Sequence, residues 1–258
     1  MKHPVEIRKE IREGRYTRPT AGLAPGYVQA NLVILRERYA FDFLLFCQRN
    51  PKPCPVLEVL EPGVYLTHSM ADGADVRTDI PKYRVFREGV LTDTVETIED
   101  LWRDDFVTFL LGCSFSFEEA LLKNGVPVRH IEEGKNVPMF KTSIPVAPAG
   151  IFKGNLVVTM RPIPEDQVVR AAQITTRYAM VHGAPVHIGR PEAIGIADLN
   201  NPDYGDAVTI REGEIPVFWA CGVTPQAVIQ EAKPDVVITH APGHMLIGDI
   251  KNESLAIF

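Results

Sequence analysis

The chain lacks the features that would place it in a membrane or in complex with nucleic acid. Its longest apolar runs are far shorter than the roughly 20 residues needed to cross a bilayer, and the N-terminal residues Met1 to Glu6 lack the apolar segment of a secretion signal. No basic block stands out, and 33 acidic residues against 27 basic ones give a formal charge of −6. We therefore expect a cytoplasmic protein with neither a membrane nor a nucleic-acid partner.

Cysteine is scarce and is not arranged as a known metal or redox motif. None of Cys47, Cys54, Cys113 and Cys221 forms a Cys-x-x-Cys pair, so the spacing excludes a zinc ribbon and a thioredoxin-like site. We expect reduced thiols that are mostly buried as small hydrophobic side chains. A glycine-rich nucleotide-binding motif is also missing, so we expect no cofactor and leave a divalent metal open.

Numerous prolines and glycines, 21 and 19, divide the chain into short elements. The spacing of apolar residues, together with the positions of turn-forming residues, predicts where helices and strands lie. The expected helices are 4–13, 27–48, 97–111, 116–124 and 164–181, and the expected strands are 56–60, 64–66, 155–160 and 184–188.

The last part of the chain carries the clearest structural pattern. An apolar strand at 215–221, a helix at 224–233 begun by Thr224 as its N-cap, and a second apolar strand at 235–239 indicate a parallel βαβ unit in a sheet covered on both faces. The sequence thus predicts an α/β protein with a three-layer α/β/α main domain from residues 1–125 and 191–258. Residues 126–190 are expected to form a smaller, inserted two-layer α+β domain. Ligands of parallel sheets bind beyond the carboxyl ends of the strands, which directs attention to the loops after 221 and 239.

Two serines lie where a helix is expected to begin. Ser116 and Glu119 fit a capping box. Free backbone N–H groups at that N-terminus, with Ser114 and Ser116 hydroxyls and Cys113 beside them, would suit a carboxylate. The alternative is that Ser116 merely caps its own helix.

Two arginines stand at expected strand ends, each directly before a proline. Arg161 and Arg190 are therefore candidates for a bidentate carboxylate clamp. A solvated or ion-paired arginine is the alternative at either position.

Histidines gather at element ends in the second half, at His182, His187, His240 and His244. Imidazole titrates near neutral pH, so general acid–base catalysis is the expected role. His240 and His244 are separated by a Pro-Gly pair that excludes a helical metal motif, although a metal site formed with Asp249 stays open.

Asp198 and Cys221 are the remaining candidates. Asp198 lies in a loop rich in carboxylates and amides, where turn formation is the alternative explanation. Cys221 ends an expected strand and could bind substrate or act as a nucleophile, whereas a buried structural thiol is the alternative.

Seven segments, taken in order between about residues 20 and 250, resemble the hydro-lyase family related to D-glutamate cyclase. They are Ala24 to Asn31, Gly112 to Glu118, Val157 to Pro162, His182 to Gly189, Ala197 to Leu199, Pro216 to Thr224 and His240 to His244. The resemblance implies a two-domain α/β fold and a lyase that removes water. In the cyclase itself the reaction converts D-glutamate to 5-oxo-D-proline.

This chemistry needs a clamp for the α-carboxylate, donors for a developing oxyanion and a proton carrier. We expect Arg161 or Arg190 to be the clamp, the region of Ser114 and Ser116 to hold the second carboxylate, and His240 or His244 to move protons, oriented by Asp198. His187 is a further catalytic candidate, and Cys113 and Cys221 complete the expected binding residues. The expected partner is a small acidic substrate, and a homodimer is possible. Dehydration of another hydroxy or amino acid, a binding protein of 5-oxoproline metabolism, and a metal-dependent hydrolase remain as alternatives.

Overall fold

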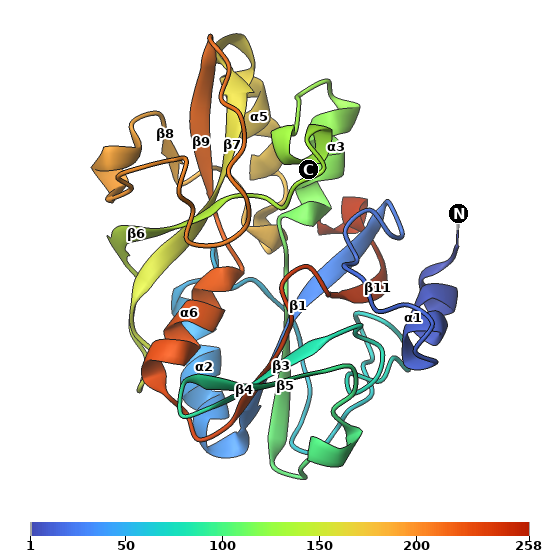
Figure 1. Cartoon of the computed structure of the whole chain (residues 1–258). Coiled ribbons are helices and arrows are strands. Elements are labelled where there is room, and N and C mark those ends of the chain that lie inside the picture. The colour runs from blue at the N-terminus through green and yellow to red at the C-terminus, as the bar shows by residue number, and fades with distance from the viewer. Residues whose placement is uncertain (1, 258) are drawn as a thin grey trace.

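Two antiparallel β-sheets organise residues 2–257, the part of the chain that this computed structural model describes (Figure 1). The strands of the larger sheet are β1 (Tyr27–Arg36), β2 (Val56–Val59), β3 (Tyr83–Arg87), β4 (Val90–Val95), β5 (Phe106–Leu111), β10 (Val237–His240) and β11 (Leu246–Lys251). Their order is β2-β5-β1-β10-β3-β4, and β11 also pairs with β1. Strand β1 is therefore the centre of the sheet, with three antiparallel partners.

A smaller sheet of four strands lies beside the first. Its strands are β6 (Met139–Pro145), β7 (Asn155–Pro164), β8 (His187–Ile188) and β9 (Glu214–Ala220), in the order β6-β7-β9-β8. The long pairing of β7 with β9 places Arg161 opposite Val217 in the middle of this sheet.

The helices connect and cover the sheets. They are α1 (Pro4–Arg12), α2 (Glu37–Arg49), α3 (Phe115–Lys123), α4 (Arg129–Glu132), α5 (Val168–Thr176) and α6 (Val223–Ala232). Short 3-10 helices are η1 (Glu99–Leu101), η2 (Glu165–Gln167), η3 (Ala179–Val181), η4 (Pro191–Ile194) and η5 (Asn252–Leu255). No helix within residues 2–257 is both long enough and apolar enough to span a membrane.

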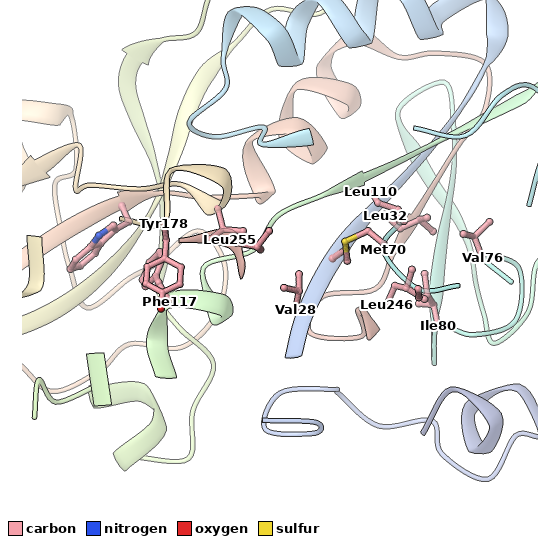
Figure 2. Packing of buried hydrophobic residues seen from close by; sticks show 14 of the residues in the cluster. Val28, Leu32, Met70, Val76, Ile80, Leu110, Phe117, Tyr178, Leu246 and Leu255 are labelled. Atoms are coloured by element: carbon pink, nitrogen blue, oxygen red, sulfur yellow. The ribbon is translucent and has the colours of Figure 1, made fainter. Parts of the chain in front are cut away.

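Strand β1 is buried on both of its faces. Alternate residues of a strand point to opposite faces, and Val28 and Leu32 pack with Met70 in one hydrophobic cluster (Figure 2). Val33 packs in a second cluster, which also contains Phe43 of α2, Val228 of α6 and residues of the four-stranded sheet. The second cluster is the core between the two sheets.

The predicted three-layer α/β/α arrangement with a parallel βαβ unit is wrong. Strand β9 belongs to the four-stranded sheet and β10 to the seven-stranded one, so α6 connects two sheets rather than two parallel neighbours. All strand pairs within the described part of the chain are antiparallel. An apolar run indicates that both faces of a strand are covered, but it does not indicate whether the strand is parallel or antiparallel to its neighbours.

Three predicted helices are also wrong in type or extent. The segment 27–48 divides into strand β1 and helix α2, and the segment 97–111 contains η1 and strand β5. A short, continuous apolar run cannot be assigned to a helix or a strand from its periodicity alone. The helix expected at 164–181 is split into η2, α5 and η3.

Thr224 joins α6 to the four-stranded sheet. Its Oγ1 accepts a hydrogen bond from the backbone N–H of Val157 at 3.0 Å and donates one to the Val157 carbonyl at 3.1 Å. Helix α6 begins at Val223, with Gly222 as its N-cap, so Thr224 lies inside the helix and the predicted N-cap is wrong. The hydroxyl binds the neighbouring strand instead of its own helix.

Replacing Thr224 by Val keeps the side-chain shape but leaves the Val157 N–H without this partner. We expect the free energy of unfolding to fall by about 1–3 kcal/mol, the cost of an unsatisfied buried donor. Urea unfolding of T224V measures this loss. The control is T176V, on the exposed side of α5, where the hydroxyl bonds only to a helix carbonyl; equal stability losses in the two variants would contradict the assignment.

Candidate functional site

A cavity of about 580 Å³ lies beside the N-terminal end of β1. Its walls come from residues 19–27, from the faces of α3 and α4, and from the turn at 242–243, together with Asn252. Most of its lining is apolar, and its size is within the range of about 300–1,000 Å³ for small-molecule sites. The few polar side chains in its walls are therefore the candidates for chemistry.

A carboxylate and an imidazole meet in this wall. Glu118 of α3 and His130 of α4 both line the cavity, and His130 Nε2 lies 3.2 Å from Glu118 Oε1. Both side chains are buried, with 7% and 5% of their surface exposed. Within residues 2–257 the other ring nitrogen of His130, Nδ1, has no hydrogen-bond partner. An imidazole held by a carboxylate on one side is free to exchange protons on the other.

Arg161 of β7 lies behind Glu118 and holds it. Its Nε donates to Glu118 Oε1 at 3.1 Å, and its Nη2 makes a still closer contact with the same oxygen. Nη1 donates to Thr159 Oγ1 at 2.9 Å and Nη2 to Ser114 Oγ at 3.1 Å. Arg161 is 0% exposed. A buried guanidinium requires a compensating charge, and Glu118 supplies it.

Glu118 stays ionised although it is buried. Burial alone would raise its pKa, but the positive charge of Arg161, with hydrogen bonding by His130 and Arg161, outweighs burial and leaves the pKa below the usual value. Glu118 therefore acts as a fixed negative charge that orients His130, rather than as a proton donor.

Three of the residues expected from the sequence lie around Arg161. Ser114 bonds to it directly, and Cys113 and Cys221 are close enough to interact electrostatically with it. Desolvation raises the pKa of Cys113 to about 12 and that of Cys221 to about 11. Both sulfurs are thus thiols at neutral pH, which does not favour a nucleophilic role.

Ser116 differs from its expected role. The N-cap of α3 is Ser114 rather than Ser116, and no side chain caps this helix, so the predicted capping box is wrong. The Ser116 side chain is buried within the first turn, and its Oγ has no partner in the described structure. An unpaired buried hydroxyl is uncommon.

None of the candidate residues expected from the sequence lines this cavity, and three of them are partly or fully exposed elsewhere. His187 Nε2 contacts the carbonyl of Arg190 at 2.8 Å, and the Arg190 side chain is exposed. Asp198 is exposed and accepts a hydrogen bond from the backbone N–H of Asn200 at 2.9 Å, as in an Asx turn. Their catalytic or binding roles stay predictions.

His240 and His244 are held by backbone groups. His240 Nδ1 accepts the N–H of Leu32 at 3.1 Å at the end of β10, which requires a neutral ring nitrogen. Burial lowers the pKa of His240 to about 4. His244 Nδ1 lies 2.9 Å from the Pro242 carbonyl, and partial burial lowers its pKa also.

The metal site that the sequence left open, formed by His240, His244 and Asp249, is not seen among residues 2–257. Asp249 forms a bidentate pair with Arg8, with both N–O distances at 2.9 Å. Among residues 2–257, no three His, Cys, Asp or Glu side chains are grouped so that they could hold a metal ion.

Sequence reasoning missed Glu118 and His130 as a pair. Glu118 stands in the segment that resembles the family, yet it reads there as an ordinary residue of a helix. His130 lies in a four-residue helix, α4, that no periodicity indicates. An acidic residue in one segment and an arginine at a strand end in another are only a weak signal for an ion pair. The contact with His130 depends on how α3 and α4 pack.

The matching family model and the sequence relatives identify the same family. The family model described as "D-glutamate cyclase" matches residues 107–249. The chain is 63% identical to "Putative hydro-lyase YcsI" of Bacillus subtilis, over 98% of this chain and 99% of that protein. Proteins of the same designation from Bacillus velezensis and Stutzerimonas stutzeri are 65% and 59% identical, each over 98% of this chain and 96% of theirs. A solved nitrogen repressor-like protein of Methanococcus jannaschii aligns over 98% of this chain and 99% of its own, with a TM-score of 0.39 and 10% sequence identity.

The raised pKa values predict slow thiol alkylation. At pH 8 we expect Cys113 and Cys221 of the native protein to react with iodoacetamide at least about a hundred times more slowly than in the urea-unfolded chain, because only the thiolate reacts and an ordinary thiol has a pKa of about 8.5. Mass spectrometry of peptides from timed samples measures both rates. Rapid labelling of Cys221 in the folded protein would contradict this.

Buried neutral histidines predict a loss of stability in acid. Burial lowers the pKa of both His182 and His240 to about 4, so the unfolded chain binds protons that the folded protein does not as the pH falls from about 6.5 to 4. Each histidine then lowers the free energy of unfolding by up to about 1.4 kcal/mol per pH unit in that window.

The variant H240Q removes one of these two contributions. Its unfolding free energy should fall less steeply between pH 6.5 and 4 than that of the wild type, as measured by urea unfolding at several pH values. The exposed His68 provides the matched control H68Q, which should keep the wild-type slope. Equal slopes for H240Q and the wild type would exclude a buried neutral His240.

Proposed function

Because the chain belongs to the D-glutamate cyclase family and is a carbon–oxygen lyase, we propose that it removes water from D-glutamate to form 5-oxo-D-proline. The observation that carries the choice of site is a buried set of three residues, in which Glu118 and His130 line the cavity and Arg161 lies behind Glu118. All three residues lie within the segment that the family model matches.

The reaction moves protons in one direction only. The amine nitrogen attacks the γ-carboxyl carbon, a C–N bond forms, and one C–O bond breaks as water leaves. Starting from the ammonium and carboxylate forms, the nitrogen gives up two protons and the departing oxygen gains two. The site therefore needs a group that accepts protons from nitrogen and delivers them to oxygen, with no net exchange with solvent.

His130 is suited to this transfer. Its Nδ1 is free to accept a proton within the cavity, while Glu118 holds the other side of the ring and stabilises the imidazolium that forms. The charge of Arg161 keeps the pKa of Glu118 low, so the carboxylate does not take the proton itself. Each member of the set thus has a separate task.

The carboxylates of the substrate need donors in the same cavity. Lys135 is the lysine of the cavity lining, and it is exposed, with Glu133 and the Ala207 carbonyl as its present partners. An exposed ion pair of this kind is weak. Lys135 can therefore turn to a substrate carboxylate at little cost.

We expect the purified enzyme to convert D-glutamate to 5-oxo-D-proline, followed by chiral chromatography with mass detection. H130Q should lower kcat by at least about a hundredfold, since general acid–base catalysis contributes about 10²–10⁴. Thermal unfolding of H130Q should resemble that of the wild type, which shows that the fold is intact.

H68Q, an equivalent exchange at an exposed histidine, should keep wild-type turnover. In the same assay, R190A and D198A test the site assignment that was made from the sequence. Turnover that survives in H130Q but is lost in R190A or D198A would move the active site to the loops near η4. Turnover of a hydroxy acid but not of either glutamate enantiomer would change the substrate.

A further inference from the structure

A second polar pair in the cavity wall is not used by the proton transfer. Glu119 and Asn252 both line the cavity, and Asn252 Nδ2 donates to Glu119 Oε2 at 3.2 Å. The backbone N–H of Asn252 is fixed to the Gly26 carbonyl at 2.9 Å. A Cβ at Gly26 would make an ordinary van der Waals contact with Glu119 Oε2, at 3.8 Å. The pair is thus held against the loop that forms the opposite wall.

The Asn252 side chain has an unused acceptor. The residue is 5% exposed, and its Oδ1 has no hydrogen-bond partner within residues 2–257. Turning the amide over would place Oδ1 against the Glu119 carboxylate, so the contact with Glu119 fixes the orientation. A buried carbonyl oxygen without a donor is uncommon, and an N–H group of a ligand in the cavity can supply one.

The Glu119 carboxylate is the negative charge of the lining that has no buried cation as its partner. Glu118 is neutralised by the buried Arg161, whereas the cation near Glu119 is Lys123, 3.0 Å from Oε1 and 58% exposed. Such an exposed pair contributes little. Two acceptors, one of them charged, match a group with several N–H donors and a positive charge. They do not match a carboxylate, and a hydroxyl would use only one of them.

We propose that Glu119 and Asn252 form the subsite that binds the primary ammonium group of the substrate. The proposal rests on the proposed function and deepens it, because this subsite selects amino acids over hydroxy acids of the same skeleton. Glu118 and Glu119 are consecutive residues of α3, so their side chains leave the helix about 100° apart. The nitrogen is then held on one wall while His130, on the adjoining wall, receives its proton.

Calorimetric titration with D-glutamate and with glutarate, which lacks only the amino group, tests the subsite without requiring turnover. E119Q and N252L should each weaken D-glutamate binding about tenfold or more, the effect of losing one charge-assisted hydrogen bond. Their affinity for glutarate should match that of the wild type, and thermal unfolding should show that both variants are folded.

K123M is the matched control, because it removes the ion-pair partner of Glu119 and leaves the cavity lining unchanged. It should bind D-glutamate like the wild type. The subsite is overturned if K123M reproduces the loss, if E119Q weakens both ligands equally, or if the wild type binds D-glutamate no better than glutarate.

The outcomes for the subsite and for the reaction are separable. Amine-dependent binding of D-glutamate without turnover upholds the subsite and removes the proposed reaction. Turnover of D-glutamate with unchanged KM in E119Q and N252L upholds the reaction and removes the subsite. The subsite is also overturned if the wild type binds none of the amino acids D-glutamate, L-glutamate and D-aspartate more tightly than the diacids glutarate and succinate.

Discussion

The ion pair between Arg161 and Glu118 is the constraint on which the rest of the site depends. Arg161 is part of β7 in the four-stranded sheet, and Glu118 is part of α3, which follows β5 of the seven-stranded sheet. The pair therefore joins the two halves of the molecule where both charges are removed from water. Losing one partner of such a pair leaves a bare buried charge, at a cost of about 3–5 kcal/mol. The same contact fixes the carboxylate against which His130 is oriented.

Two kinds of buried histidine show how environment separates structure from chemistry. His240 accepts a backbone N–H in place of a strand partner, and burial keeps its ring neutral. His130 instead faces a carboxylate that stays ionised because of Arg161. Residue type alone would assign both to proton transfer. The neighbour that each ring meets is what distinguishes them.

Part of this arrangement could be predicted from the sequence. The strand bearing Arg161 and the helix that follows Ser114 are visible as local apolar patterns, and these residues do meet. The direction of the strands was not predictable, because burial on both faces gives β9 and β10 the same composition in a parallel or an antiparallel sheet. The partners of Glu118 were not predictable either, since Arg161 is 43 residues away and His130 lies in a single helical turn.

The central position of β1 has a consequence for how the protein reaches this fold. Two of its three neighbours, β10 and β11, follow it in the chain only after all the strands of the four-stranded sheet. Contacts so distant in sequence require the closure of very long loops and form slowly. A nascent chain must therefore carry an apolar strand without its full set of partners until β10 and β11 have been made, and an unpaired apolar strand of this kind is prone to aggregation.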